Sequence, residues 1–554
     1  MRQRARSFPT RPQGNFEVRG IQARDSLSGN LRRCGYQGLS QSRKKREITN
    51  LLQTRSCWGE TITAAMHDLP VIIQGGMGAG VSSWRLAQAV SRLGQLGVVS
   101  GTAIDAILVR RLEDGDPGGH MRRGLAAFPF RAMAERIERA YYIPGGKAAG
   151  AAYRRLPMHA HEEPRELAEL CMVANFVEIF LAREGHDGVV GINYLEKIQI
   201  PHLPSIYGAM LAGVDYVLMG AGIPLHVPGV LNRLALHQAA EYALHVTGAV
   251  EGDDFKMRFD PREYLEGDLP LLKRPAFLAI VSSNTLAATM LRRANGRVDG
   301  LILESKTAGG HNAPPRGKLQ LSAEGEPVYG ARDTVDLGTL RELGTPFWLA
   351  GGYGSAAKLR EALEAGATGV QVGTAFAFTR ESALREDLKQ ALLEKAQRHE
   401  AQVFTDPLAS PAGFPFKVAR LEGTASEDAV VAARPRICDL GFLREMYRDE
   451  EGRVAYRCPA EPLTVYLAKG GTAEQAAGRK CLCNSLVANI GHQQVRCGRH
   501  EEPALVTAGD DLTEVTRFLP DGAASYSAAD VLEALLEGNA ATPVHEAVSA
   551  VSGD

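Results

Sequence analysis

The residues best suited to proton chemistry lie close together in one short stretch of the sequence. His311 follows the dipeptide Gly309-Gly310, and Glu304 ends the apolar run just before them. A histidine exchanges protons near neutral pH, and glycines let the backbone approach a flat ring or a phosphate. A helix-capping or surface histidine would be the non-catalytic interpretation of His311. Because of the glycines beside it, we predict that His311 is the catalytic acid–base, with Glu304, Gly309 and Gly310 near a bound cofactor.

Three more glycine turns each follow an apolar run. Backbone N–H groups at such turns bind phosphate, especially where a helix follows, as it does near Ser355. The first turn does not match a dinucleotide-binding loop, which needs a different glycine spacing and an acidic residue on the next strand. We expect the turns to contact a cofactor through the following residues: Gly75, Gly76 and Met77 in the first, Gly351 and Gly352 in the second, and Gln371, Gly373 and Thr374 in the third.

Short apolar runs alternate with amphipathic helical stretches from Val71 onward, which is the pattern of βα units around a parallel sheet. Eight runs can be counted, the number that closes a TIM barrel, and a doubly wound sheet is the alternative. The gap between Gly101 and Gly188 is long enough to require extra helices. Asn193 and Gly220 end the third and fourth runs, so we place them at the mouth of the barrel. The expected strands are 71–74, 96–100, 189–193, 216–220, 277–282, 300–304, 347–351 and 370–373.

The turns together resemble those of the nitronate monooxygenase (2-nitropropane dioxygenase) family. The resemblance covers residues 69–383 and rests on the Gln-Gly-Gly-Met, Ala-Gly-Gly-His and Ala-Gly-Gly turns and on Gln-Val-Gly-Thr-Ala-Phe followed by Thr379 and Glu381-Ser382. It implies FMN at the mouth of the barrel, with glycine loops around its phosphate and His311 near the reactive flavin nitrogen. It also implies an FMN-dependent oxidoreductase that denitrifies nitronates with oxygen.

The sequence leaves other reactions open. Glu304 resembles the FMN-dependent enoyl-acyl carrier protein reductases, which use NAD(P)H to reduce an enoyl thioester in fatty acid or polyketide biosynthesis. Ser305, Lys306 and Thr307 also depart from the monooxygenase pattern. A third interpretation is a flavin- or metal-binding partner without catalysis, which the intact His311 and glycine turns disfavour. Fold class alone does not decide between these reactions.

Length and charge divide the chain into three regions. A chain of 554 residues is longer than a single hydrophobic core usually contains. We predict a basic disordered tail at 1–65, a barrel with a helical insertion at 66–400, and an appended region at 401–554. The tail has thirteen Lys or Arg against four Asp or Glu, and Met66 follows it directly. Without a secretory signal or an apolar run of membrane length, we expect a cytoplasmic enzyme. We expect a small-molecule substrate and neither nucleic acid nor membrane as partner; a homodimer stays open.

Four cysteines of the appended region are candidate metal ligands. Cys438, Cys458, Cys481 and Cys483 could together hold a structural zinc or, less favoured, an iron–sulfur cluster, with Cys497 and His492 nearby in the sequence. The spacing includes one Cys-x-Cys and no Cys-x-x-Cys, so free thiols are the competing interpretation.

Overall fold

Eight parallel strands close into a barrel, as the sequence predicts. The computed structural model describes residues 69–265, 267, 269–496 and 500–537, so the predicted basic tail lies outside the described residues. In the barrel each strand pairs with the next, and the last pairs with the first. The strands are β1 (Ile72–Gln74), β2 (Leu96–Ser100), β3 (Val190–Leu195), β4 (Tyr216–Gly220), β7 (Ala276–Val281), β8 (Gly300–Glu304), β9 (Phe347–Ala350) and β10 (Gly369–Val372).

Helices surround the barrel and join most of its strands. The connection from β2 to β3 holds four helices, as expected from its length. The helices up to β10 are α2 (Trp84–Arg92), α3 (Ile104–Glu113), α4 (His120–Ala127), α5 (Arg131–Tyr141), α6 (Arg165–Arg183), α7 (His202–Leu211), α8 (Val227–Ala235), α9 (Asn284–Arg293), α10 (Leu337–Glu342) and α11 (Ala356–Glu364). None of the described helices is both long and apolar enough to cross a membrane.

Alternation along the strands creates two apolar layers. Side chains of alternate residues, such as Ile73, Val98, Ile302 and Trp348, fill the inside of the barrel. Trp348 is fully buried there and donates its indole N–H to the backbone oxygen of Pro70, 2.8 Å away. The remaining strand residues pack outward against the helices. The interior is therefore a packed core, and a ligand can enter only at an end of the barrel.

The chain after β10 is loop-rich and returns to the barrel at its end. Its helices are α12 (Thr374–Ala377), α13 (Glu386–Gln397), α14 (Asp428–Ala433), α15 (Leu463–Ala468), α16 (Ala473–Ala476), α17 (Leu482–Ala488) and α18 (Ala528–Leu536). Small hairpins pair β5 (Ala240–Ala243) with β6 (Lys256–Phe259), β11 (Val403–Asp406) with β12 (Phe416–Ala419), β13 (Glu445–Arg448) with β14 (Val454–Arg457), and β15 (Val495–Arg496) with β16 (His500–Glu501). Short 3₁₀ helices are η1 (Pro261–Glu263), η2 (Ala331–Asp333) and η3 (Asp510–Phe518).

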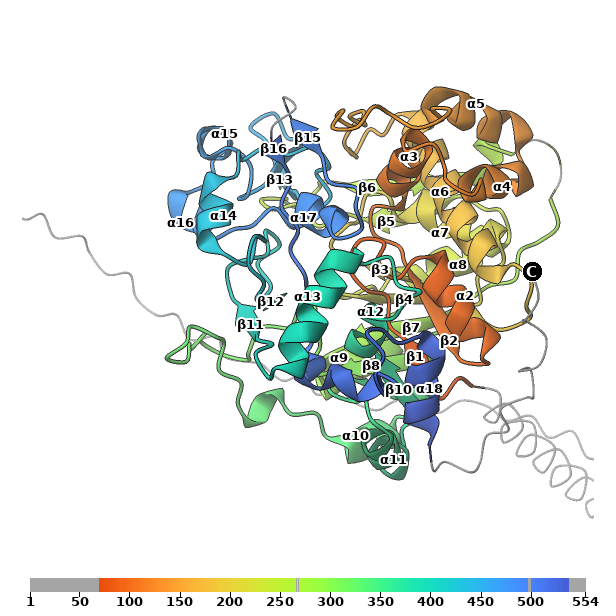
Figure 1. Cartoon of the computed structure of the whole chain (residues 1–554). Coiled ribbons are helices and arrows are strands. Elements are labelled where there is room, and N and C mark those ends of the chain that lie inside the picture. Colours follow the sequence, from red (N-terminus) through yellow and green to blue (C-terminus); the bar gives the residue numbers. More distant parts are fainter. Residues whose placement is uncertain (1–68, 266, 268, 497–499, 538–554) are drawn as a thin grey trace, which may run out of the picture. The chain divides into compact units, whose positions relative to one another are not determined.

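The last helix packs on the ring of barrel helices. α18 lies beside α2 and α11, and Figure 1 shows it next to the start of the barrel although it ends the described chain. Just before it, the Tyr526 hydroxyl donates to the backbone oxygen of Ala375, 2.8 Å away, and the Ala528 N–H donates to the Glu381 carboxylate. This short helix at the end of the described chain therefore belongs to the outer layer of the barrel.

Candidate active site

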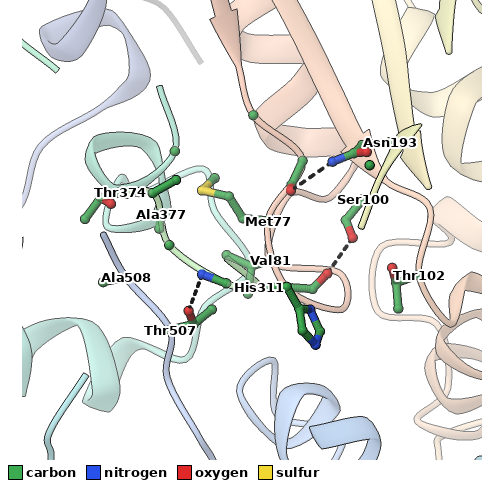
Figure 2. A pocket seen from close by; sticks show the side chains of 18 of the residues that line it. Met77, Val81, Ser100, Thr102, Asn193, His311, Thr374, Ala377, Thr507 and Ala508 are labelled. Atoms are coloured by element: carbon green, nitrogen blue, oxygen red, sulfur yellow. Dashed lines mark hydrogen bonds between the residues drawn. The ribbon is translucent and has the colours of Figure 1, made fainter. Parts of the chain in front are cut away.

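One cavity at the mouth of the barrel contains the predicted site. Its volume is about 210 Å³, and it opens where the carboxyl ends of the strands meet. Figure 2 shows Asn193, Met77, Thr374 and His311 around it, each from a different segment. All fourteen residues expected to contact a cofactor or to act in catalysis line this cavity: Gly75, Gly76, Met77, Asn193, Gly220, Glu304, Gly309, Gly310, His311, Gly351, Gly352, Gln371, Gly373 and Thr374.

The first glycine turn is held by the side chain of Gln74. This side chain is fully buried and donates to the Ser82 hydroxyl, 2.9 Å away, and to the backbone oxygen of Val98. Ser82 in turn accepts from the Met77 N–H at 3.0 Å, and the Gly75 N–H donates to Val372. These bonds fix the turn between β1, β2 and β10. Met77 is thereby held at the edge of the cavity.

The two later turns present backbone donors to the cavity. Gly351 and Gly352 have φ of 88° and 74°, which favours glycine, and Ser355 caps the helix that follows them. Within the described residues, no protein acceptor takes the N–H of Gly351, Gly352 or Gly373. A Cβ at Gly373 would meet only Met77, with its sulfur 3.6 Å away. The turns therefore have the free donors that a phosphate requires.

Two buried amide oxygens in the cavity have no partner in the protein. They are Oδ1 of Asn193 and Oε1 of Gln371. The Asn193 amide nitrogen donates weakly to the Gly76 carbonyl, at 3.4 Å (Figure 2). Buried polar atoms are nearly always hydrogen-bonded in native proteins, so a missing partner indicates a missing ligand or water. These oxygens can accept hydrogen bonds from ring N–H groups of a bound molecule.

His311 is held on the other side of the cavity by the hairpin β11–β12. Its Nε2 lies 2.7 Å from the Ser410 hydroxyl, and its ring meets Phe416 edge-on at 4.9 Å. Burial, together with the positive charge of Lys197, lowers the pKa of His311 to about 4. The imidazole is therefore neutral at physiological pH, and it has one free lone pair or one free N–H depending on its tautomer.

Glu304 is the last residue of strand β8, and its carboxyl group lines the cavity. Burial raises the pKa of its carboxyl to about 8. The group is therefore mostly protonated at neutral pH and can donate a hydrogen bond or a proton. Neutral His311 and protonated Glu304 belong to the same segment at the end of β8. Two neighbouring groups whose pKa values are shifted in opposite directions are typical of active sites.

The region after residue 500 completes the cavity, which the sequence analysis did not predict. The Gly310 N–H donates to the Thr507 hydroxyl at 2.8 Å, as Figure 2 shows, and the Gly509 N–H donates to the Thr374 hydroxyl at 2.9 Å. Asp511 also lines the cavity, and burial raises the pKa of its carboxyl. No motif marks this segment, because its role depends on contacts with turns that precede it by more than 130 residues.

The four candidate metal cysteines surround one small cavity in the region after the barrel. Cys438, Cys458, Cys481 and Cys483 all line it, and Cys483 also lines the large cavity. Among the described residues, however, no three of these sulfurs lie within 4.8 Å of one another. His492 instead bonds to Asp114 at 3.0 Å, and Cys497 lies outside the described residues. The structure thus gathers the four cysteines without bringing them to ligand distance, and the metal assignment stays a prediction.

One known protein family matches the second half of the barrel. Residues 271–409, from just before β7 to β11, match the family described as nitronate monooxygenase. This segment is similar to that family. The match includes Glu304, His311 and both later glycine turns, so the resemblance predicted from the sequence is confirmed. The chain is an enzyme, a flavin-dependent oxidoreductase.

Three solved structures are distantly similar to this chain. Nitroalkane oxidase from Streptomyces ansochromogenes is 16% identical, with 84% of this chain and 94% of that chain covered and a TM-score of 0.39. FabK from Thermotoga maritima is 18% identical, with 78% and 94% covered and a TM-score of 0.36. The enoyl reductase domain of MlnA from Bacillus amyloliquefaciens is 12% identical, with 84% and 93% covered and a TM-score of 0.37. These scores are too low to carry an argument. A comparison with curated protein sequences found no match.

Proposed function

We propose that this enzyme binds FMN at the mouth of its barrel and oxidises nitronates with molecular oxygen. One observation carries the proposal: the predicted flavin and catalytic residues, which come from six of the barrel strands and their following turns, line a single cavity. The family match over residues 271–409 supports the same reaction class. Pockets at the carboxyl ends of barrel strands are where TIM-barrel enzymes carry out their chemistry.

The residues present fit FMN. The free N–H groups of Gly351, Gly352 and Gly373 suit its phosphate, and the unpartnered oxygens of Asn193 and Gln371 suit the N–H group of its ring. When bound, FMN would supply the electron acceptor that the protein side chains lack. The chain would contribute orientation and an enclosed site.

The two titratable groups of the turn would manage protons and substrate charge. His311 is neutral above about pH 4, so it can accept a proton or donate a hydrogen bond to a nitro oxygen. Its bond to Ser410 limits the rotation of the ring and fixes which nitrogen faces the cavity. Glu304 in its protonated form avoids placing a negative charge beside an anionic nitronate.

Enoyl-thioester reduction with NAD(P)H is the second candidate, and Glu304 favours it. A carboxyl with a pKa of about 8 is protonated at neutral pH and can deliver a proton to a substrate carbon during reduction of a double bond. His311 would then hold the thioester carbonyl.

The cytoplasmic location and the homodimer stay predictions.

Anaerobic flavin reduction distinguishes the two reactions. The purified yellow protein is mixed with propane-2-nitronate in one sample and with NADPH in another, and the visible flavin band is followed. We expect the nitronate to bleach the band, and readmitted oxygen to restore the colour with release of nitrite. Bleaching by NADPH alone would support the reductase. A protein that purifies without FMN and binds none when FMN is added would overturn both proposals.

A further inference from the structure

A second cluster of reactive side chains lies between the helical insertion and the region after the barrel. Asp105 is in the first turn of α3, Cys171 is within α6, and His159 is in the loop between α5 and α6. One ligand atom from each lies within 4.8 Å of the other two. All three residues are buried, with 1–5% of their surface exposed. None of them belongs to the flavin cavity.

We propose that Asp105, His159 and Cys171 bind a divalent transition metal ion, of which Zn²⁺ fits best. The Nε2 atom of His159 lies 3.0 Å from the Asp105 carboxylate and 3.8 Å from the Cys171 sulfur. In a tetrahedral zinc site, ordinary metal–ligand lengths place nitrogen about 3.4 Å from oxygen and about 3.6 Å from sulfur. The observed separations are close to these edges. Nitrogen, oxygen and sulfur together are a typical zinc ligand set.

The hydrogen bonding of His159 supports a metal between these groups. A ring nitrogen carries at most one proton. The Nε2 atom of His159 therefore cannot donate a good hydrogen bond to Asp105 and to Cys171 at the same time. A metal ion would bind all three at once. On the other side of the ring, Nδ1 contacts the carboxylate of Glu163, which is the arrangement in which a carboxylate orients a metal-bound histidine.

Charge supports the same assignment. In the described part of the chain, the only ion-pair partner of the buried Asp105 and Glu163 carboxylates is His159. Burying carboxylates without enough positive charge is costly, and a divalent ion removes this cost. On binding, the ion would replace the thiol proton of Cys171, which would leave for solvent.

A small cavity beside Asp105 could hold a water molecule near the proposed metal. A cavity of about 20 Å³ is lined by Asp105, Asn175 and Tyr194, and this is room for one water molecule. The Tyr194 hydroxyl donates to the Asn175 amide oxygen at 2.9 Å, which leaves the Asn175 side chain fixed beside this space. Three protein ligands and one water would complete tetrahedral coordination.

The site would pin a long loop to the wall of the flavin cavity. Residues 142–164 contain no helix or strand, although such long loops are uncommon in compact domains. The loop also contacts the region after the barrel: the Tyr153 N–H donates to Gln494, and the Arg444 guanidinium donates to the backbone oxygen of His159. Asp105 follows Thr102 and Ala103, which line the flavin cavity. The metal would therefore join three segments behind that wall.

Metal analysis of the full chain tests the proposal. We expect about one zinc per chain when the protein is purified without chelators, and X-ray absorption at the zinc edge should show one sulfur with nitrogen and oxygen neighbours. Cys171→Ser should lose the metal. Glu163→Gln should keep the fold and weaken zinc affinity roughly 10–100-fold, because it removes only the group that orients His159.

The cysteines of the other small cavity provide the matched control. Cys481→Ser with Cys483→Ser should leave the metal content unchanged. Four sulfur neighbours in the absorption spectrum, or loss of zinc in this double variant alone, would move the metal to the other cysteines and overturn the proposal. A native protein without metal that also fails to bind added Zn²⁺ would overturn it as well. If Cys171→Ser does not fold, the native absorption spectrum and Glu163→Gln still decide.

Discussion

Replacing Glu304 by glutamine should change how the stability of the protein depends on pH. Burial raises the pKa of this carboxyl from 4.5 to about 8 in the folded state. Between these values the folded protein holds a proton that the unfolded chain releases, so the free energy of unfolding falls as pH rises from about 4.5 to about 8. Below this window the group is protonated in both states and makes no such contribution.

The size of the effect follows from the two pKa values. The difference between 4.5 and about 8 corresponds to at most about 5 kcal/mol at pH 8, and solvent near the cavity mouth will reduce it. Glu304→Gln keeps the shape of the side chain and removes the titration. We therefore expect equal stability of the two proteins near pH 4, and a variant that is more stable than the parent by a few kcal/mol near pH 8.

Urea unfolding at several pH values, followed by circular dichroism, measures this difference. Comparing each variant with the parent at the same pH cancels the titration of all other groups. The exposed Glu342→Gln serves as control and should follow the parent at every pH. If the free energies of unfolding of Glu304→Gln and of the parent change with pH in the same way, the carboxyl of Glu304 is not held protonated in the folded protein. The role of Glu304 as an acid would then be refuted.

Three further outcomes are expected. His311→Ala should remain folded and yellow but lose on the order of 10²–10⁴ in the rate of flavin reduction by substrate, while the exposed His245→Ala keeps the parent rate; equal rates would end the catalytic assignment. Gly352→Leu and Gly373→Leu should purify without FMN, because side chains there would keep phosphate from the backbone N–H groups; a yellow variant would contradict this. A chain that starts at Met66 should stay soluble and bind FMN, and a colourless or insoluble product would show that the tail is structural.

The sequence by itself determined the barrel and the residues at its mouth. All eight apolar runs became strands, with ends within two residues of the expected ones, because buried parallel strands are short apolar segments that local pattern reveals. The glycine turns and His311 were recognisable for a related reason. Each follows a strand directly, and the carboxyl ends of all strands in a parallel barrel meet at one mouth.

Only the tertiary structure decided which distant segments complete the two sites. Thr507 and Asp511 reach the flavin cavity, and Ser410 fixes His311, although no spacing links these residues to the turns that they contact. The sequence directed attention to cysteines that are close together along the chain. The structure instead brings Cys171 to ligand distance of His159 and Asp105, residues separated by up to 66 positions. Local patterns report strands and turns, whereas contacts between loops depend on how the completed core places them.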